Sequence, residues 1–311
     1  MCDIISIEVN AKINLVLDVA ARRADGYHQI SSVFHSVALL DRLSIRKAPE
    51  KSLWSNNPLI PRDDSNLVLK AIEQLELATE TKLDCAFTLG KEIPLAAGLG
   101  GGSADAAGAL ILANELFDLK LTQSDLMAIG AKVGADVPFM LIGGAALVKG
   151  IGEEITKIEA APNWGVLLVK PPFGIRTGAA YQLLDTSTIW HPQTLVMIEA
   201  IKTKDLKLAS LALGNSFQTP IFDTCPSLRV ITEELAELGA TGIVLSGSGP
   251  TIMAITEDNE MGQKLLKKLR DRFKDWYWPE NDLDNPIIAK GKNIEPWIYQ
   301  TCLSRQDWQI K

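Results

Sequence analysis

The chain has 311 residues, 47% of them hydrophobic, which is enough for two ordinary domains. Its formal net charge of −7 makes it a poor candidate for binding the phosphates of a nucleic acid. No stretch approaches the ~20 consecutive apolar residues of a membrane span, and the N-terminus lacks the basic region and apolar run of a signal peptide. Four scattered cysteines without a CxxC pair fit reduced thiols in the cytoplasm, and three histidines argue against a histidine-rich metal site.

The first predicted element is a strand at 7–17, in which apolar and polar residues alternate. A period of two buries one face of a strand and places Lys12 and Asn14 together on the opposite face, roughly 7 Å apart. The turn-rich segment 24–28 follows, and a second alternating run leads to residues 43–45. The opening of the chain therefore predicts two strands joined by a turn, with two polar side chains on one face.

A glycine-rich segment, GLGGGS at 98–103, follows a predicted helix at 65–78, capped by Ser65, and a predicted strand at 83–89. Glycines let the backbone approach a ligand closely, and the start of the helix that follows carries partial positive charge, so the segment predicts an anion site. Its spacing matches neither GxGxxG nor GxxxxGK[ST], which argues against a Rossmann or P-loop site. The structural alternative is a flexible hinge before a capped helix.

The rest of the chain mixes helices and strands without a regular βαβ repeat, which favours an α+β fold. A helix is expected from Thr122, a good N-cap, to Gly134, a good C-terminal stop. Two apolar runs at 139–142 and 145–148, separated by two glycines, predict a hairpin, and a domain boundary is expected near 157–163. The second half reads as a strand at 165–170, a helix at 226–238, a strand pair flanking 246–250 and a helix at 260–274. We expect an N-terminal domain at 1–158, a C-terminal domain at 159–278 and an extension at 279–311.

The last 36 residues concentrate four of the seven tryptophans, at positions 276, 278, 297 and 308. Aromatic side chains bury large areas, so this tail is expected to pack either on the body of the protein or on a second subunit. The sequence leaves both a monomer and a homodimer open.

Lys12 and Asp136 are the two charged residues that we single out for catalysis. Phosphoryl transfer to an alcohol needs a group that orients or deprotonates the hydroxyl, and positive charge where negative charge develops. A carboxylate beside an ammonium would meet both needs. Alone, each residue type is more often a solvated surface charge, so their pairing depends on the following resemblance.

Three blocks of the chain resemble the GHMP kinases, the galactose, homoserine, mevalonate and phosphomevalonate kinases. They are AKINLVLDVAARRADGYHQISSVF at 11–34, IPLAAGLGGGSADAAGAL at 93–110 and GADVPFMLIGGAALVKGIGE at 134–153, with a weaker fourth block, SGSGPTIMA, at 246–254. The KINL and RADGYH combination is more specific than the glycine loop. It is similar to the members that phosphorylate a cytidyl-diphosphate-linked polyol in the non-mevalonate route to isoprenoid precursors. The resemblance extends over residues 4–275.

The resemblance implies a two-domain α+β GHMP kinase fold that binds ATP, Mg²⁺ and a small-molecule alcohol in the cleft between the domains. It implies Lys12 and Asp136 as the catalytic pair. For ATP it implies Lys91, Asn66 and the loop residues Pro94, Leu95, Ala96, Ala97, Gly98, Leu99, Gly100, Gly101, Gly102, Ser103 and Ala104. For the alcohol substrate it implies Asn14, Tyr27, His28, Thr177 and Tyr181, with Tyr27 and Tyr181 on the two faces of a cytosine ring.

The chain departs from the family pattern at three places. Ala104 stands where many members have a second serine, Arg176 stands where small residues are common, and the tryptophan-rich tail is unlike the family. Two other functions stay open. The first is a kinase for another alcohol, and the RADGYH block and Tyr181 argue against it. The second is an inactive nucleotide-binding paralogue, and the presence of Lys12 and Asp136 argues against it.

Overall fold

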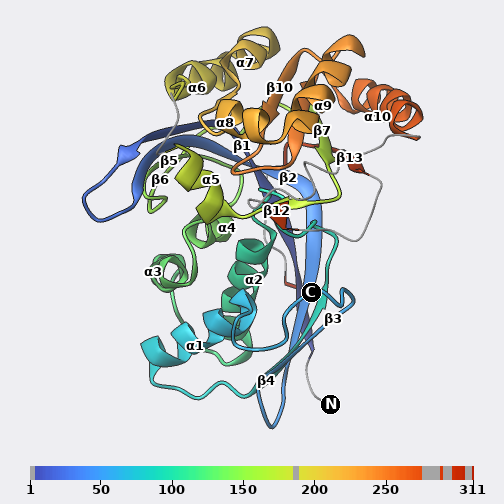
Figure 1. Cartoon of the computed structure of the whole chain (residues 1–311). Helices are drawn as coiled ribbons and strands as arrows, with labels where there is room; N and C mark the ends of the chain where they lie inside the picture. Colours follow the sequence, from blue (N-terminus) through green and yellow to red (C-terminus); the bar gives the residue numbers. More distant parts are fainter. Residues whose placement is uncertain (1–3, 185–188, 275–287, 290–295, 305–309) are drawn as a thin grey trace.

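The computed structural model describes residues 4–184, 189–274, 288–289, 296–304 and 310–311. Within these ranges the chain forms a seven-stranded sheet, a four-stranded sheet and a two-stranded sheet, with helices packed against the two larger ones (Figure 1). The mixture of helices and mostly antiparallel strands confirms the predicted α+β class.

A long antiparallel hairpin is the centre of the larger sheet (Figure 1). The strands of this sheet are β1 (Ile5–Arg22), β2 (His28–Lys47), β3 (Ser52–Ser55), β4 (Cys85–Gly90), β5 (Ala145–Gly150), β6 (Glu154–Lys157) and β9 (Gly214–Asn215). Their order is β3-β4-β2-β1-β9, and β5 pairs with both β2 and β6. The predicted alternation in β1 is confirmed on its apolar face, but the face of Lys12 and Asn14 is buried too, because other elements cover it.

Four helices cover the larger sheet (Figure 1). They are α1 (Leu67–Thr79), α2 (Gly101–Leu116), α3 (Gln123–Val133) and α4 (Val137–Ile142). The helix α2 lies against β1 and β2, and the other three pack against α2. Thr122 caps α3 through a capping box with Asp125, and Gly134 ends the helix, as the sequence predicts. The N-cap of α1 is Asn66, so the prediction of Ser65 is wrong by one residue.

The predicted hairpin at 139–148 is also wrong. Residues 137–142 form α4, with a proline in its first turn, where a missing N–H costs no helical hydrogen bond. The second apolar run is β5, whose hairpin partner is β6, further along the chain. A short apolar run with no polar alternation fits a buried helix as well as a strand, which is why the pattern misled.

The second half of the chain builds the four-stranded sheet, in the order β10-β11-β7-β13. Its strands are β7 (Gly165–Lys170), β10 (Gly242–Leu245), β11 (Ile252–Thr256) and β13 (Trp297–Cys302), while β8 (Gly174–Ile175) and β12 (Ile288–Ala289) pair separately. The helices of this half are α5 (Thr177–Leu184), α6 (Thr194–Thr203), α7 (Leu206–Ala212), α8 (Gln218–Thr224), α9 (Pro226–Glu237) and α10 (Asn259–Phe273). The helix α9 packs on β10 and β11, whereas α10 packs on β7, β11 and β13.

The two halves exchange elements. The strand β9 pairs in parallel with β1, and α6 packs on β1 and β2, so part of the second half completes the larger sheet. The predicted boundary near 157–163 falls between β6 and β7 and stays a prediction, as do the three domain ranges. None of the helices in the described ranges has the length and apolar character that a membrane crossing requires.

The described part of the tail packs on the body of the protein. The strand β13 pairs antiparallel with β7, and Ser304 N donates to Ser36 O of β2 at 2.9 Å. Lys311 and Ser6 exchange two backbone hydrogen bonds, of 2.9 and 3.0 Å, beside β1. The end of the chain therefore runs from the smaller sheet onto the larger one. Trp276, Tyr277, Trp278, Trp308 and the predicted boundary at 278 lie outside the described residues.

Candidate active site

A cavity of about 1120 Å³ lies between the two halves of the chain. Its walls come from the β1–β2 hairpin, the glycine loop before α2, the segment between α3 and α4, the helix α5 and the loop after β10. The predicted site residues that line it are Lys12, Asn14, Tyr27, His28, Lys91, the loop residues 94–103, Asp136, Thr177 and Tyr181. Asn66 and Ala104 do not line it. The structure thus brings most of the predicted residues together.

Lys12 and Asp136 face each other in this cavity, with 3.4 Å between Lys12 Nζ and Asp136 Oδ2. The Lys12 side chain is 6% exposed and that of Asp136 is 32% exposed, so the ammonium is enclosed while the carboxylate is open to a ligand. Lys12 Nζ donates to Asn14 Oδ1 at 2.8 Å and lies 4.3 Å from the centre of the Phe34 ring. Asp136 occupies the N-cap position of α4 without a capping hydrogen bond from its side chain. Its carboxylate therefore stays available to a substrate.

Asn14 is itself held in one orientation. Its Nδ2 donates to Ser32 Oγ at 3.0 Å, and Ser32 Oγ in turn donates to the carbonyl of Val16. Because the amide nitrogen is engaged by Ser32, the amide oxygen of Asn14 is directed at Lys12. This short chain of polar contacts is buried and fixes the position of the Lys12 ammonium.

The glycine loop forms the anion-binding geometry that its sequence predicts. Gly100 is the N-cap of α2 with a left-handed φ of 69°, and no side chain caps the helix, so the N–H groups of its first turn are available to an anion. A Cβ on Gly100 would lie 2.3 Å from Met140 Cε and 2.9 Å from Lys12 Cγ. Lys12 N donates to Leu99 O at 3.0 Å, which ties the loop to β1 and argues against a free hinge.

The SGSGP segment of the second half closes over this loop. Gly98 has a φ of 74°, and Ser246 Oγ donates to its carbonyl oxygen at 3.2 Å. A Cβ on Gly98 would lie 2.2 Å from Ser246 O, so the two backbones touch only because a glycine stands here. Nearby, the hydroxyls of Thr177 and Ser248 are hydrogen-bonded at 3.0 Å. Both halves of the chain are therefore needed to form the cavity.

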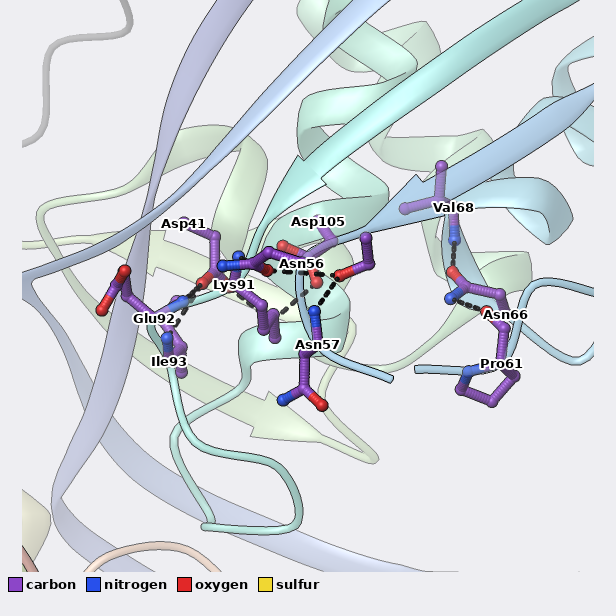
Figure 2. A network of polar contacts seen from close by, with 11 residues as sticks. Asp41, Asn56, Asn57, Pro61, Asn66, Val68, Lys91, Glu92, Ile93 and Asp105 are labelled. Carbon is purple, nitrogen blue, oxygen red and sulfur yellow. Dashed lines mark hydrogen bonds and ion pairs between the residues drawn. The ribbon is translucent and has the colours of Figure 1, made fainter. Parts of the chain in front are cut away.

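Figure 2 shows a buried cluster of three charged residues, Asp41, Lys91 and Asp105. It lies next to the glycine loop, since Lys91 Nζ is 2.9 Å from the place of a Cβ on Gly101. Lys91 Nζ is ion-paired with Asp41 Oδ2 and, at 2.7 Å, with Asp105 Oδ2. The second oxygen of Asp41 accepts from the backbone N–H groups of Glu92 and Ile93 at 2.6 and 2.9 Å. The three charged side chains are at most 5% exposed, and Asp105 Oδ1 has no hydrogen-bond partner. The cluster is therefore a fully desolvated group of two carboxylates and one ammonium.

The charge states in this cluster follow from its burial and composition. Burial opposes the charged form of Lys91, but the carboxylates of Asp105 and Asp41 outweigh that effect and raise the Lys91 pKa. Burial raises the pKa of Asp105 to about 8, against the attraction of Lys91 and with the repulsion of Asp41. One ammonium thus pairs with two carboxylates, and burial favours the protonated form of Asp105.

Lys91 and Asn66, predicted as contacts with ATP, both have partners within the chain, and their contact with ATP stays a prediction. Lys91 Nζ is committed to two carboxylates and lies 2.9 Å from where a Cβ on Gly101 would be, so we infer that it supports the loop from below. Asn66 is occupied at both polar atoms (Figure 2): its Oδ1 accepts from Val68 N at 2.9 Å and its Nδ2 donates to Pro61 O at 2.8 Å. In this structure Asn66 caps α1.

Aromatic side chains gather at the hairpin end of the cavity. The rings of His28 and Tyr181 lie 4.9 Å apart and tilted by 30°, and Tyr181 meets Phe217 edge-on at 4.9 Å. Burial, and then the negative charge of Asp136, raises the pKa of Tyr181 to about 12, so its hydroxyl stays protonated. Tyr27 is 60% exposed. The predicted clamp of Tyr27 and Tyr181 around a base stays a prediction, with Tyr181 already held in place by its neighbours.

Sequence reasoning missed several residues of this site. Phe34 and Ser32 hold the Lys12–Asn14 pair, and Asp41 balances Lys91 from a different strand. The signal for Phe34 and Ser32 is present, because both lie on β2 directly across from the KINL strand once the register is known. No spacing in the sequence links Asp41 to the glycine loop.

Comparisons with known proteins identify the family of the chain. The model of the GHMP kinases N terminal domain matches residues 66–144, and that of the GHMP kinases C terminal domain matches 197–275. A 4-diphosphocytidyl-2-C-methyl-D-erythritol kinase of Clostridium botulinum is 36% identical over 271 residues, 86% of this chain and 97% of that protein. One of Exiguobacterium sibiricum is 39% identical over 268 residues, 86% of this chain and 94% of that protein.

Solved structures give the same result for the fold. A crystal structure of 4-(cytidine 5'-diphospho)-2C-methyl-D-erythritol kinase superimposes with a TM-score of 0.74 at 26% identity and covers 96% of this chain and 99% of that one. A homoserine kinase from Cytophaga hutchinsonii has a TM-score of 0.77 at 18% identity, covers 100% of this chain and 98% of that one, and supports the fold alone. The chain therefore belongs to the GHMP kinases and, within that family, to the group of the 4-diphosphocytidyl-2-C-methyl-D-erythritol kinases.

Proposed function

We propose that this chain transfers the γ-phosphoryl group of ATP to the 2-hydroxyl of 4-diphosphocytidyl-2-C-methyl-D-erythritol, a step in the non-mevalonate route to isoprenoid precursors. The observation that carries the proposal is the Lys12–Asp136 pair, 3.4 Å apart, in a cavity that also holds an uncapped helix N-terminus and an aromatic cluster. The curated relatives at 36% and 39% identity are named for this activity and support the choice of alcohol.

In the proposed reaction Asp136 orients the acceptor hydroxyl and takes its proton as the hydroxyl oxygen forms a bond to the γ-phosphorus. The bond from the γ-phosphorus to the bridging oxygen breaks, and that oxygen leaves with its electron pair on ADP. Lys12 places positive charge where the transferring group concentrates negative charge. The contacts of Lys12 with Asn14 and Phe34 fix the position of its ammonium, so the side chain needs little reorganisation during the transfer.

Magnesium fits this site as part of the nucleotide substrate. In the described ranges no group of three or more His, Cys, Asp or Glu side chains is arranged to hold a metal ion. Magnesium commonly keeps several waters and is bound through nucleotide phosphates and one or two protein oxygens. The donors near the glycine loop are of that kind, the Ser103 hydroxyl and the Asp136 carboxylate, both on the cavity wall. When bound, the ion would neutralise phosphate charge.

The test is an ADP-release assay on the purified chain with ATP, Mg²⁺ and separate acceptors: the cytidyl compound, homoserine, mevalonate and galactose. We expect turnover with the cytidyl compound and at least about 100-fold lower kcat/KM with the others, because only the cytidyl compound offers a flat base to the aromatic cluster. Turnover with only homoserine, mevalonate or galactose would contradict the proposed acceptor but support the proposed kinase activity. No turnover with any acceptor, from a chain that binds ATP, would favour an inactive paralogue.

Two variants test the catalytic pair directly. Asp136→Asn and Lys12→Met should each lower kcat by at least ~100-fold while the Kd for ATP stays within a small factor, as general-base and electrostatic contributions are of this size. Methionine is chosen at position 12 because it keeps the alkyl chain that packs near Gly100. Asp205→Asn, the same change at the N-cap of α7 outside the cavity, is the matched control and should keep parental turnover. Near-parental kcat in Asp136→Asn would remove this carboxylate from the mechanism.

A further inference from the structure

The positive charges at the glycine-loop end of the cavity are largely cancelled by carboxylates. Lys12 is paired with Asp136, and the single charge of Lys91 is shared between Asp41 and Asp105. The nucleotide proposed above carries a triphosphate. Because the chain has a net charge of −7, positive charge must be concentrated at the binding site to attract it. Backbone N–H groups of α2 supply partial charge only. Neither Lys12 nor Lys91 therefore offers the phosphates a positive charge that is not already shared with a carboxylate of the chain.

Lys132 is the cation that lies in the right place. It is in the last turn of α3, is exposed, and lines the cavity together with residues 133–136, which lead to the catalytic Asp136. This wall adjoins the glycine loop: a Cβ on Gly134 would lie 3.8 Å from Ser103 Oγ, in the first turn of α2. A lysine carries its ammonium on a flexible four-carbon stem, which lets Lys132 extend from this wall toward an anion at the loop.

Lys132 has neither a carboxylate partner nor a side-chain hydrogen bond among the residues that the structure describes. Two acids of the described ranges line the cavity: Asp136 is paired with Lys12, and Glu153 turns its carboxylate back to accept from Ile151 N at 2.5 Å. We propose that Lys132 binds the phosphates of the nucleotide and supplies the net positive charge at this end of the cavity. The proposal rests on the ATP-dependent function proposed above and adds a nucleotide-binding residue to it.

The alternative role for Lys132 is the ordinary one of a basic residue that stabilises the C-terminus of a helix. Lys202 allows the two roles to be separated. It is also an exposed lysine in the last turn of a helix, α6, but it does not line the cavity. A substitution at either position removes the same interaction with a helix end. Only the one at Lys132 removes a charge from the cavity.

The experiment compares Lys132→Gln, Lys132→Arg and Lys202→Gln by calorimetric titration with ADP and, separately, with adenosine. We expect Lys132→Gln to weaken ADP binding by about tenfold, the size of one charge-assisted hydrogen bond that is partly screened by solvent. Adenosine affinity should stay unchanged because adenosine has no phosphate. Lys132→Arg should bind ADP within about threefold of the parent, since it keeps the charge. Lys202→Gln should bind both ligands as the parent does.

Equal ADP affinity in Lys132→Gln and the parent would overturn the proposal, as would equal losses for ADP and adenosine. Thermal melts of both glutamine variants check the helix-end role, which predicts equal small decreases. The ADP titration needs no acceptor alcohol. If the parent fails to phosphorylate the cytidyl compound while Lys132→Gln still loses ADP affinity, the acceptor assignment fails and the role of Lys132 stands.

Discussion

Replacing Asp105 with asparagine should change how the stability of the protein depends on pH. The Asp105 side chain is 5% exposed, one of its oxygens is 2.7 Å from Lys91 Nζ, and the other has no hydrogen-bond partner. Burial raises its pKa to about 8, whereas an unfolded aspartate titrates near 3.8. Between these values the native state holds a proton that the unfolded state has lost. Asparagine occupies the same volume and has no such proton.

The sign and size follow from proton linkage. Because the native state binds the extra proton, the free energy of unfolding falls as the pH rises from about 4 and levels off above about 8. At pH 6 the pH lies below the pKa of Asp105 and at pH 9 above it, and a shift of one pKa unit is worth about 1.4 kcal/mol. The free energy of unfolding should therefore fall by roughly a few kcal/mol more in the wild type than in Asp105→Asn between pH 6 and pH 9. The Lys91 pKa is raised above its usual range and titrates outside this window.

The assay is urea denaturation of both proteins at pH 6 and pH 9, which gives four free energies of unfolding. Other groups, such as the buried His35 with its pKa lowered to about 4, are common to both proteins and cancel in the difference. Asp64→Asn, at an exposed site, is the control: its free energy of unfolding should change between pH 6 and pH 9 by the same amount as that of the wild type. If the free energies of unfolding of Asp105→Asn and the wild type change equally between pH 6 and pH 9, Asp105 does not titrate in this window and the description of the cluster is wrong.

Two further predictions concern ligand binding. Gly98→Ala should abolish ATP binding in calorimetry, because its Cβ would lie 2.2 Å from Ser246 O at a φ of 74°. Gly102→Ala is the control: its Cβ meets only Leu67 Cδ1, at 3.3 Å, so its affinity for ATP should stay within a small factor of the parent's. Tyr27→Ala should raise the KM for the cytidyl substrate by about 5- to 150-fold, from base–aromatic stacking of about 1–3 kcal/mol, and Tyr27→Phe should not. Parental KM in Tyr27→Ala would contradict the clamp.

Local patterns predicted the elements whose signals are local. The alternation in the KINL strand put Lys12 and Asn14 on one face, and the structure places them 2.8 Å apart between Nζ and Oδ1. Thr122 and Gly134 marked both ends of α3, because capping depends on neighbouring residues. The glycine loop was predicted as an anion site from signals of the same kind, since its glycines and the following helix are contiguous. The structure shows the uncapped start of that helix, and the anion site stays a prediction.

Features that depend on distant segments could not be predicted in this way. The pairing of Lys91 with Asp41 needs the register of β2 against β4, which no spacing reveals. The apolar run at 139–142 was expected as a hairpin strand because four apolar residues show no period. Its helical state depends on packing against α2 and α3. The cap of α1 was predicted at Ser65 and lies at Asn66, because serine and asparagine are both favourable caps and the sequence does not decide between neighbours.

The order in which the smaller sheet is assembled has a consequence for synthesis on the ribosome. All six residues of β7 are buried, and β7 lies between β11 and β13. The chain that forms β13 is made last among the strands, so β7 emerges long before its second neighbour and presents an apolar edge until then. Such an edge favours association with other nascent chains. A chain shortened before residue 296 should therefore aggregate during expression, and co-expressed chaperones should recover it more readily than a lower growth temperature alone.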